Sequence, residues 1–377
     1  MIRINDKKDC TGCHACASAC PTKCITLNAD TQGFHYPEVE VERCIACGRC
    51  ERTCPVLHPC EVHHPIAVYA SKNADEEVRM QSSSGGLFTP LAEEILGRGG
   101  VVFGARFDDS WRVVHDYVET VEGLSSLRGT KYVQSYIGDT FVQVRNFLKQ
   151  GRWVLFTGTP CQVAGLKHYL HRDYGRLLTV EVVCHGVPSP LVWNTYLNEI
   201  TTKNERIIRV EMRHKSTGWS AYSMQIASTR GMLYNGKARH NVYSRGFLAD
   251  FYLRPSCHAC PAKQGRSGAD ITLGDYWGIR TLHPSLDDDR GVSLVAIHTE
   301  KGMNFFGALH VISKETTYAQ ALQLNPALAR SASQNPLCEE FWRRFPREGM
   351  KAVHRLWWKK RFMRLWSIVK KLKTPKT

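Results

Sequence analysis

The sequence has no long apolar run. Its 377 residues include no stretch of about 18 consecutive apolar residues, roughly the length that a membrane-spanning helix requires. The first ten residues, MIRINDKKDC, also lack the apolar segment of a secretory signal. We therefore expect a soluble cytoplasmic protein, and the length is sufficient for two or more domains at roughly 150 residues each.

Acidic residues are missing from the end of the chain. The net charge is +15, and ten positive charges lie between Lys351 and Lys376, a segment without Asp or Glu. The positive excess therefore belongs to a tail and not to a folded domain. For this reason we do not expect nucleic acid as a partner.

The tail, residues 346–377, predicts a basic amphipathic helix. Its basic residues fall mainly on one side of a helical wheel, and the opposite side carries Trp357, Trp358, Phe362, Leu365, Trp366, Ile368, Val369 and Leu372. Such a helix suits the headgroup layer of an anionic membrane, which would place the protein peripherally on the inner membrane face. Docking on the body of the protein or on a partner is an equal alternative.

Cysteine, in contrast, is abundant, with fifteen in the chain. Disulfides are rare in a reducing compartment, so ligation of metals or clusters is the better explanation. The segments CTGCHACASACP and CIACGRCERTCP share the spacing C-x2-C-x2-C-x3-C-P and begin 34 residues apart. This doubled pattern is the signature of bacterial ferredoxins with two 4Fe-4S clusters. The predicted ligands are Cys10, Cys13, Cys16, Cys20, Cys44, Cys47, Cys50 and Cys54.

The fourth cysteine of each run binds the other cluster in this pattern. Cys54 is therefore assigned to the first cluster and Cys20 to the second, while Cys24 is expected to be a buried spectator. A pair of zinc knuckles is the alternative. Residues 1–62 then form an electron relay that moves one electron at a time and performs no substrate chemistry.

Two later segments each place a cysteine just after a predicted strand. Cys161 stands at the start of a helix whose N-cap is Thr159, and Cys184 follows the next strand. Successive strand–helix units predict a parallel sheet, so both thiols should lie at its carboxyl edge, where open α/β sheets build their sites. The C-x2-C pair Cys257 and Cys260 would complete a set of four. A 4Fe-4S cluster, a zinc ion and, for Cys161, a nucleophile or core thiol are the alternatives.

A loop rich in serine and glycine precedes another predicted helix. Ser84, Gly85 and Gly86 offer hydroxyl and backbone N–H groups that can cradle a phosphate. Serine is also among the commonest helix caps. The residues alone leave both interpretations open.

Six motifs together resemble the beta subunits of coenzyme F420-reducing hydrogenase and F420-linked dehydrogenases. They are SSSGG, GTKYVQS, FTGTPCQ, CHGVPSP, the C-x2-C pair and ADITLGDYWG. The resemblance covers roughly residues 66–310, after a fused ferredoxin domain. It implies an α/β fold, α+β overall, in which a flavin-binding domain with a mostly parallel sheet occupies residues 63–145 and 146–345 and a basic helix ends the chain.

The resemblance also implies FAD beside a third 4Fe-4S cluster. By position, Cys161, Cys184, Cys257 and Cys260 are the cluster ligands. Ser84, Gly85 and Gly86 belong to the FAD phosphate loop, and Lys131 and Tyr132 contact flavin or substrate. Near the site we also expect Asp270, Gly274, Asp275 and Trp277. No catalytic residue is assigned.

The expected function is that of an iron–sulfur flavoprotein oxidoreductase. Electrons pass between a hydride carrier, an F420-like deazaflavin or a nicotinamide, and ferredoxin or a partner protein, through FAD and the 4Fe-4S clusters. Two alternatives are a ferredoxin-dependent reductase of an organic substrate and a non-catalytic electron-transfer adaptor.

Overall fold

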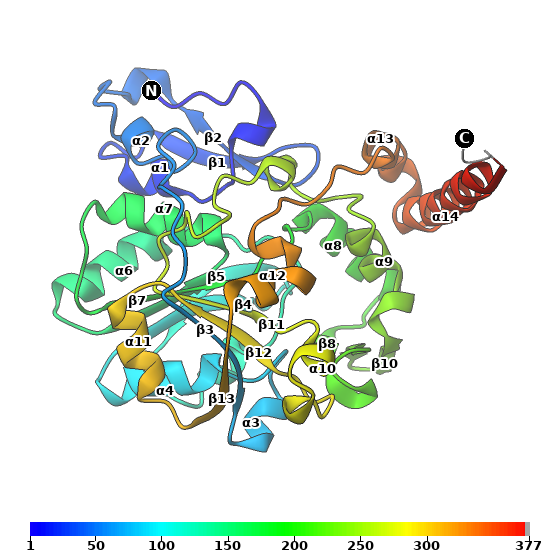
Figure 1. The fold of residues 1–377 in the computed structure, drawn as a ribbon. Coiled ribbons are helices and arrows are strands. Elements are labelled where there is room, and N and C mark those ends of the chain that lie inside the picture. Colours follow the sequence, from blue (N-terminus) through cyan, green and yellow to red (C-terminus); the bar gives the residue numbers. More distant parts are fainter. Residues whose placement is uncertain (374–377) are drawn as a thin grey trace.

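The computed structural model describes the backbone of residues 1–373 and the side chains of residues 1–363. An N-terminal domain of short elements sits on a larger α/β domain (Figure 1). A third group of elements, a small sheet with several helices, lies beside the large sheet and ends in the long C-terminal helix.

The N-terminal domain is built from short elements joined by cysteine-containing loops. One hairpin, β1–β2, pairs Ile25 with Val39 at one end and Ala29 with His35 at the other. Positive φ angles at His14 and Ala46 let the backbone wrap tightly around the two cysteine runs. The elements are η1 (Lys7–Asp9), α1 (Ala15–Ala19), β1 (Ile25–Ala29), β2 (His35–Val39), η2 (Val41–Arg43) and α2 (Arg49–Arg52).

The large sheet has eight strands in the order β13-β3-β12-β11-β7-β6-β4-β5. The pairs β11–β7, β7–β6 and β6–β4 are parallel, and the remaining pairs are antiparallel. Strands β3, β4, β6, β7 and β11 consequently point the same way, which confirms the mostly parallel sheet. The strands are β3 (Ala67–Asn73), β4 (Val101–Phe107), β5 (Val113–Val118), β6 (Val154–Gly158), β7 (Leu177–Val182), β11 (Ile271–Asp275), β12 (Ser293–Ile297) and β13 (Val311–Thr316).

Helices cover both faces of this sheet. Within β6, Val154 and Phe156 pack into the apolar core beneath α6 and α7, whereas Leu155 packs into the core beneath α4 and α11. Alternating side chains of a strand point to opposite faces, so a strand buried on both faces is apolar throughout. The helices are α3 (Glu76–Met80), α4 (Phe88–Gly97), α5 (Leu124–Leu127), α6 (Thr140–Lys149), α7 (Pro160–Leu170), α10 (Ile279–Leu282), α11 (Glu300–Gly307) and α12 (Tyr318–Leu324).

The third group has an aromatic core of its own. Trp193, Tyr243 and Phe341 are buried where its helices meet the small sheet. Its strands lie in the antiparallel order β10-β9-β8. The elements are α8 (Pro190–Ile200), β8 (Ile207–His214), β9 (Ser223–Ser228), β10 (Gly231–Lys237), α9 (Val242–Leu248), α13 (Cys338–Glu348) and α14 (Met350–Lys373).

The basic tail is helical, as predicted, from Met350 to Lys373, and the first turns of this helix belong to the folded body. Val353 and Leu356 of α14 are buried against the third group, while Trp358 and Phe362 are exposed. The predicted apolar residues Leu365, Trp366, Ile368, Val369 and Leu372 lie outside the residues whose side chains are described. No helix in the described part of the chain is long and apolar enough to span a bilayer.

Candidate functional site: three groups of cysteines and a neighbouring loop region

The structure brings the eight N-terminal cysteines into two groups. Cys54 lies beside Cys10, Cys13 and Cys16, close enough that ionisation of one of these thiols would disfavour ionisation of its neighbours. A cavity at the other end of the domain is lined by Cys20, Cys44, Cys47 and Cys50. Each run therefore contributes its fourth cysteine to the other group, as expected for a two-cluster ferredoxin domain.

Cys24 lies closer to the second group than the sequence suggested. It is buried, as predicted, but its Sγ is 3.4 Å from Sγ of Cys20, and it lines the same cavity. A thiol in contact with a predicted ligand is part of that ligand's surroundings. Cys24 is therefore buried, as predicted, but it contacts the second group of cysteines and is not a mere spectator.

Cys161 and Cys184 follow the neighbouring parallel strands β6 and β7. Thr159 precedes α7 in a capping box, in which the N–H of Thr159 donates to Oε1 of Gln162 at 2.9 Å. Pro160 is the first residue of α7, which leaves Cys161 in its first turn. The predicted local geometry is thus confirmed, and both thiols lie at the carboxyl edge of the sheet.

Cys257 and Cys260 reach the same place from a distant segment. They lie on and just after η5 (Pro255–Ala259), and the N–H of Val187, three residues after Cys184, donates to Sγ of Cys257 at 3.4 Å. The four thiols are close enough that ionisation of one would disfavour ionisation of its neighbours. Four cysteines from three segments therefore converge, as the sequence predicted.

The four thiols are half-buried, and their surroundings disfavour the thiolate form in the absence of a cation. Burial raises the pKa of Cys184 and of Cys257 to about 12 and raises the pKa of Cys161 and of Cys260 as well. The ammonium of Lys263 opposes this effect at Cys184 and Cys260. Thiolates at this position therefore need a bound cationic centre, because metal binding is what displaces thiol protons.

This group of thiols lies directly against the first ferredoxin group. Cys13 packs on α7 so closely that a Cβ on Gly165 would lie 3.0 Å from its Sγ. Arg254, buried just before η5, donates from Nε to the carbonyl oxygen of Cys10 at 2.8 Å. Helix α7, which contains Cys161, therefore contacts the first-cluster loop. The segment that leads to Cys257 contacts the same loop.

The loop of Ser84, Gly85 and Gly86 is fastened to the sheet. Oγ of Ser84 donates to the carbonyl oxygen of Val292 at 3.0 Å, and the N–H of Gly85 donates to Oγ of Ser293 at 3.0 Å. A Cβ on Gly85 would lie 2.5 Å from the backbone of β3. Helix α4 begins only at Phe88, so Ser84 is not its N-cap and the capping interpretation is wrong.

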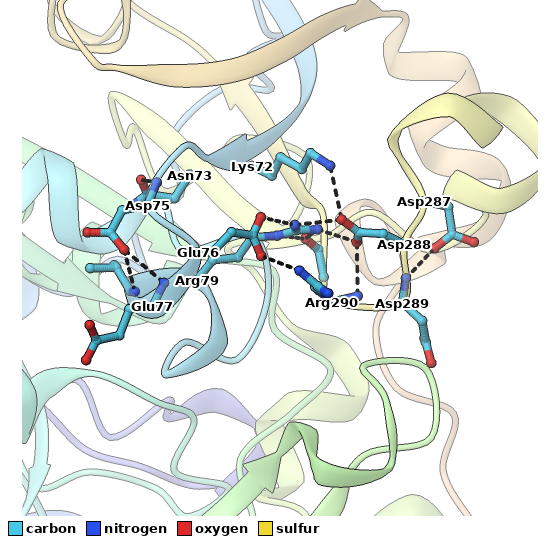
Figure 2. A network of polar contacts seen from close by, with 12 residues as sticks. Lys72, Asn73, Asp75, Glu76, Glu77, Arg79, Asp287, Asp288, Asp289 and Arg290 are labelled. Carbon is cyan, nitrogen blue, oxygen red and sulfur yellow. Dashed lines mark hydrogen bonds and ion pairs between the residues drawn. The ribbon is translucent and has the colours of Figure 1, made fainter.

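A polar network beside this loop holds α3 against the segment before β12 (Figure 2). The guanidinium of Arg79, fully buried, contacts Glu76, Asp288 and the carbonyl oxygen of Gly291. Asp288 also pairs with Lys72 at 3.1 Å. Although partial burial opposes ionisation, these hydrogen bonds hold the pKa of Asp288 well below its usual value. The network therefore supports the serine–glycine loop from outside.

Lys131 and Tyr132 lie next to the same loop. Thr130 donates from both its N–H and its hydroxyl to Oγ of Ser83, at 2.8 and 2.7 Å. Nζ of Lys131 donates to three carbonyl oxygens at the end of α5, at 2.9 to 3.0 Å, and burial lowers its pKa to about 7. The hydroxyl of Tyr132 lies beside Arg213 and Tyr222. The SSSGG and GTKYVQS segments are therefore adjacent. The ammonium of Lys131 already donates its hydrogen bonds to backbone carbonyl oxygens.

The remaining residues of the ADITLGDYWG motif divide between the two ends of β11. Asp270 binds Thr179 at 2.8 Å and Thr299 at 2.8 Å before the strand begins, so it orders the strand. Asp275, at the carboxyl end, contacts Arg213 and Trp219, and Trp277 stacks on Trp219. Only this carboxyl-end part reaches the neighbourhood of Tyr132.

Two residues of this region were missed from the sequence. His115 on β5 joins the GTKYVQS and FTGTPCQ segments, because its ring contacts Oγ of Ser135 at 2.9 Å and the carbonyl oxygen of Thr157 at 2.8 Å. Burial lowers its pKa to about 4. Arg213 on β8 is the second. Neither stands in a recognisable motif, so only the folded chain reveals them.

The residues present fit the expected groups to different degrees. Two sets of four cysteines suit two clusters, and the third set offers four half-buried thiols to a third cluster. Nε and Nη2 of Arg213 are buried without a partner among the described residues, which leaves donors for an acceptor such as a flavin. Among residues 1–363, no three His, Cys, Asp or Glu side chains are grouped to hold a single metal ion.

The fold and the cysteine groups define an iron–sulfur electron-transfer protein. A family model for a 4Fe-4S dicluster domain matches residues 9–57, and the model for the C terminus of the coenzyme F420 hydrogenase/dehydrogenase beta subunit matches residues 151–318. The chain therefore joins an N-terminal 4Fe-4S dicluster domain to a region that matches the C-terminal part of coenzyme F420 hydrogenase/dehydrogenase beta subunits.

Known relatives match separate parts of the chain. Ketoisovalerate oxidoreductase subunit VorC of Methanothermobacter marburgensis is 37% identical over 62 residues, covering 16% of this chain and 78% of that protein. One component of the F(420)H(2) dehydrogenase of Methanosarcina mazei is 20% identical over 162 residues, which are 41% of this chain but only 46% of that component.

A solved structure of the F420-reducing [NiFe] hydrogenase complex from Methanosarcina barkeri contains a similar chain. It has 18% identity and a TM-score of 0.47, with 73% of this chain and 97% of that chain covered.

Proposed function

We propose that this protein is an iron–sulfur flavoprotein that transfers electrons between a hydride carrier and a one-electron partner. The carrier is a small molecule such as a deazaflavin or a nicotinamide, and the partner is ferredoxin or another redox protein. FAD, when bound, exchanges both hydride and single electrons, and cubane clusters exchange one electron each. The order of centres is then flavin, third cluster, first cluster and second cluster, in either direction.

The observation that carries this proposal is the position of the third cysteine group. Cys161, Cys184, Cys257 and Cys260 lie together, half-buried, and their segments contact the loop of Cys10 and Cys13. A cluster held there would stand between the α/β domain and the ferredoxin domain. An isolated structural ion would not require this contact.

The protein's own residues would fix the geometry of this relay. The N–H of Val187 donates to Sγ of Cys257, and a hydrogen bond to sulfur stabilises its thiolate. Arg254 binds the ferredoxin domain at the carbonyl oxygens of Cys10, in the first-cluster loop, and His35, on β2, at 2.8 and 2.9 Å. Because Arg254 also donates to Gln134 at 3.0 Å, it connects the two domains with the GTKYVQS segment.

The flavin site is proposed at the carboxyl edge of the sheet. Ser84, Gly85 and Gly86 shape the loop on one side, and Tyr132 lies on the other. Gly86 has a φ of +83°, which lets the chain turn there without a side chain in the way. Lys131 contributes by closing the end of α5 beside this loop.

The decisive experiment is anaerobic reduction of the reconstituted protein by different donors. Reduced coenzyme F420, NADH, NADPH and reduced ferredoxin are added in parallel while flavin absorbance is followed. Bleaching by one hydride donor, followed by reduction of the clusters, supports the proposal. Purified and reconstituted protein that binds no flavin refutes it and leaves the adaptor function.

A second candidate is a ferredoxin-driven reductase of an organic substrate. A cavity between the two domains favours it, since Gly12 and His14, the neighbours of Cys13, line it together with Tyr136 and Trp193. Burial lowers the pKa of His14 to about 3, so this histidine stays neutral and cannot supply a proton as an imidazolium. Re-oxidation of the reduced clusters by an organic acceptor without any hydride donor would favour this function.

A further inference from the structure

Arg213 presents an unused pair of donors in the interior of the protein. Its side chain is 4% exposed. Nη1 donates to a carboxylate oxygen of Asp275, whereas Nε and Nη2 have no partner among the described residues. Buried polar groups are normally hydrogen-bonded. An arginine in this state therefore indicates a missing acceptor.

The free donors form one edge of the guanidinium. Nε–H and one N–H of Nη2 point in parallel to the same side, which suits a group with two adjacent acceptors. The other side is fixed, because the second carboxylate oxygen of Asp275 accepts from Nε1 of Trp219 at 2.8 Å. The two hydrogen bonds of Asp275 thus hold the guanidinium of Arg213 in one orientation.

Aromatic rings surround the guanidinium of Arg213. The guanidinium carbon lies 4.4 Å from the ring centre of Tyr222 and 5.8 Å from that of Trp277. Trp277 is itself stacked on Trp219, with ring centres 5.0 Å apart and planes inclined by 9°. Tyr132, Tyr222 and Trp277 are half-buried. A planar ligand that lies among these rings would present its edge, rather than its face, to Arg213.

These features together describe the recognition of a planar heterocycle with two acceptors on one edge. The pyrimidine edge of a flavin, with N1 beside the C2 carbonyl, has this pattern, and it gains negative charge when the flavin is reduced. The family motif residues Tyr132 and Asp275 lie against Arg213 from two sides. No sequence motif contains Arg213 itself.

We propose that Arg213 binds the N1–C2 carbonyl edge of the flavin through Nε and Nη2 and thereby stabilises the reduced flavin. This inference rests on the proposed function, because it deepens the flavin site. A cation beside N1 favours the anionic reduced form, so it shifts the flavin midpoint potential upward. Asp275 and Trp219 act as positioning residues that orient the guanidinium.

The test compares Arg213→Met and Arg213→Lys with the wild-type protein. Binding of FAD and of riboflavin is measured by quenching of flavin fluorescence, and the midpoint potential is measured by anaerobic dye titration. We expect Arg213→Met to weaken both ligands by at least about tenfold, because two charge-assisted hydrogen bonds are lost, and to lower the potential. Arg213→Lys should recover part of the potential.

Arg209→Met is the matched control. Arg209 lies on the same strand, but its side chain is half exposed and contacts only Glu211 and Gln225. It should leave flavin affinity and potential unchanged. Unchanged cluster absorbance in every variant shows that the protein still folds, and Asp275→Asn, which keeps the shape of the site, should lower flavin affinity in the same direction.

Two results would overturn the inference. In the first, Arg213→Met binds riboflavin and FAD like the wild-type protein and has the same potential. In the second, Arg213→Met loses affinity for ADP and inorganic phosphate but not for riboflavin, which would place the guanidinium at the phosphates. A wild-type protein that binds no flavin removes the proposed function as well, so the two failures are distinguishable.

Discussion

The ferredoxin domain and the α/β domain gather their thiols in different ways. In the ferredoxin domain, three cysteines of each predicted set lie within seven consecutive residues, such as Cys10 to Cys16. The third group instead combines Cys161, Cys184 and the pair Cys257 and Cys260, which meet only because β6, β7 and η5 are packed together. Each ferredoxin set takes three thiols from one loop and the fourth from the other cysteine run, whereas the third set needs the packed sheet.

This difference has a consequence for stability. The two ferredoxin sets can form while the α/β domain is still disordered, since all their thiols lie between Cys10 and Cys54 and closing short loops costs little entropy. The third set can form only after the parallel strands pair. We therefore expect the third group to depend on the fold of the α/β domain, and the two ferredoxin groups to be less sensitive to it.

The largest effect is expected from Cys161→Ser. This change removes one of four ligands, so the third cluster should be lost, and iron should fall from about twelve to about eight atoms per chain. Iron analysis with EPR of the reduced protein would measure this loss. Cys60→Ser, outside every predicted set, is the control. An unchanged iron content would remove Cys161 from the ligands.

Arg254→Met should weaken the contact between the ferredoxin domain and the α/β domain. Arg254 is fully buried and holds the carbonyl oxygens of Cys10 and His35 as well as Gln134. Leaving these acceptors unpaired should cost about 3 kcal/mol of unfolding free energy. Urea unfolding and protease cleavage between residues 58 and 66 report the change. Arg43→Met, on the exposed surface, should have neither effect, and equal stability of the two variants would contradict the docking role.

A smaller loss is expected from Arg79→Met in the network of Figure 2. Arg79 is fully buried, but its partner Asp288 is 35% exposed and water can replace part of the interaction. The expected loss of unfolding free energy is about 2 kcal/mol. Arg290→Met removes only an exposed pair with Glu76 and should change stability by less than about 0.5 kcal/mol. Thermal unfolding distinguishes them, and an equal shift for both would show that burial of Arg79 does not matter.

His115 should make the α/β domain sensitive to acid. Its pKa is lowered to about 4 in the folded protein, against about 6.5 in an unfolded chain. The unfolded state therefore takes up the proton first, so unfolding free energy is highest above about pH 6.5 and falls by at most about 1.4 kcal/mol per pH unit down to about pH 4. His115→Asn should flatten this slope, and His240→Asn, an exposed control, should not. The same slope in His115→Asn would exclude His115 as its source.

The smallest effect on stability concerns the tail. Deleting all residues after Gly349 would also remove the buried Leu356, so substitution is the sharper test of membrane contact. Trp358→Ser with Phe362→Ser changes two exposed side chains and should shift unfolding free energy by less than about 0.5 kcal/mol. If the tail binds anionic vesicles, co-sedimentation should fall, while the exposed Ile208→Ser should leave it intact. Vesicle binding that survives the double substitution would place the contact elsewhere.

Local patterns accounted for much of the fold. The strands and helices around Cys161 could be predicted because Val154 to Phe156 is an apolar run and Thr159 has cap chemistry. The meeting of Cys161 with Cys184 also followed, since parallel neighbours end at the same edge. The mixed character of the sheet did not follow, because β12 and β13 carry no feature that fixes their direction.

The region of the proposed flavin site was harder to predict. Ser84 looked like a cap because serine commonly begins a helix, yet its hydroxyl binds the residue just before β12 and α4 begins later. Lys131 looked like a ligand contact, but carbonyl oxygens occupy its ammonium. Arg213 had no pattern around it at all. Such roles depend on which distant groups come into contact, and a single sequence does not contain that information.

The most direct test of the central claim is the metal content of the anaerobically reconstituted protein, measured together with a redox titration. We predict about twelve iron atoms per chain, little zinc, and three reducible cluster signals, of which one is lost in Cys161→Ser. About eight iron atoms with about one zinc atom per chain would contradict the account. In that case the thiols of Cys161, Cys184, Cys257 and Cys260 would hold a structural ion and not a link in the electron path.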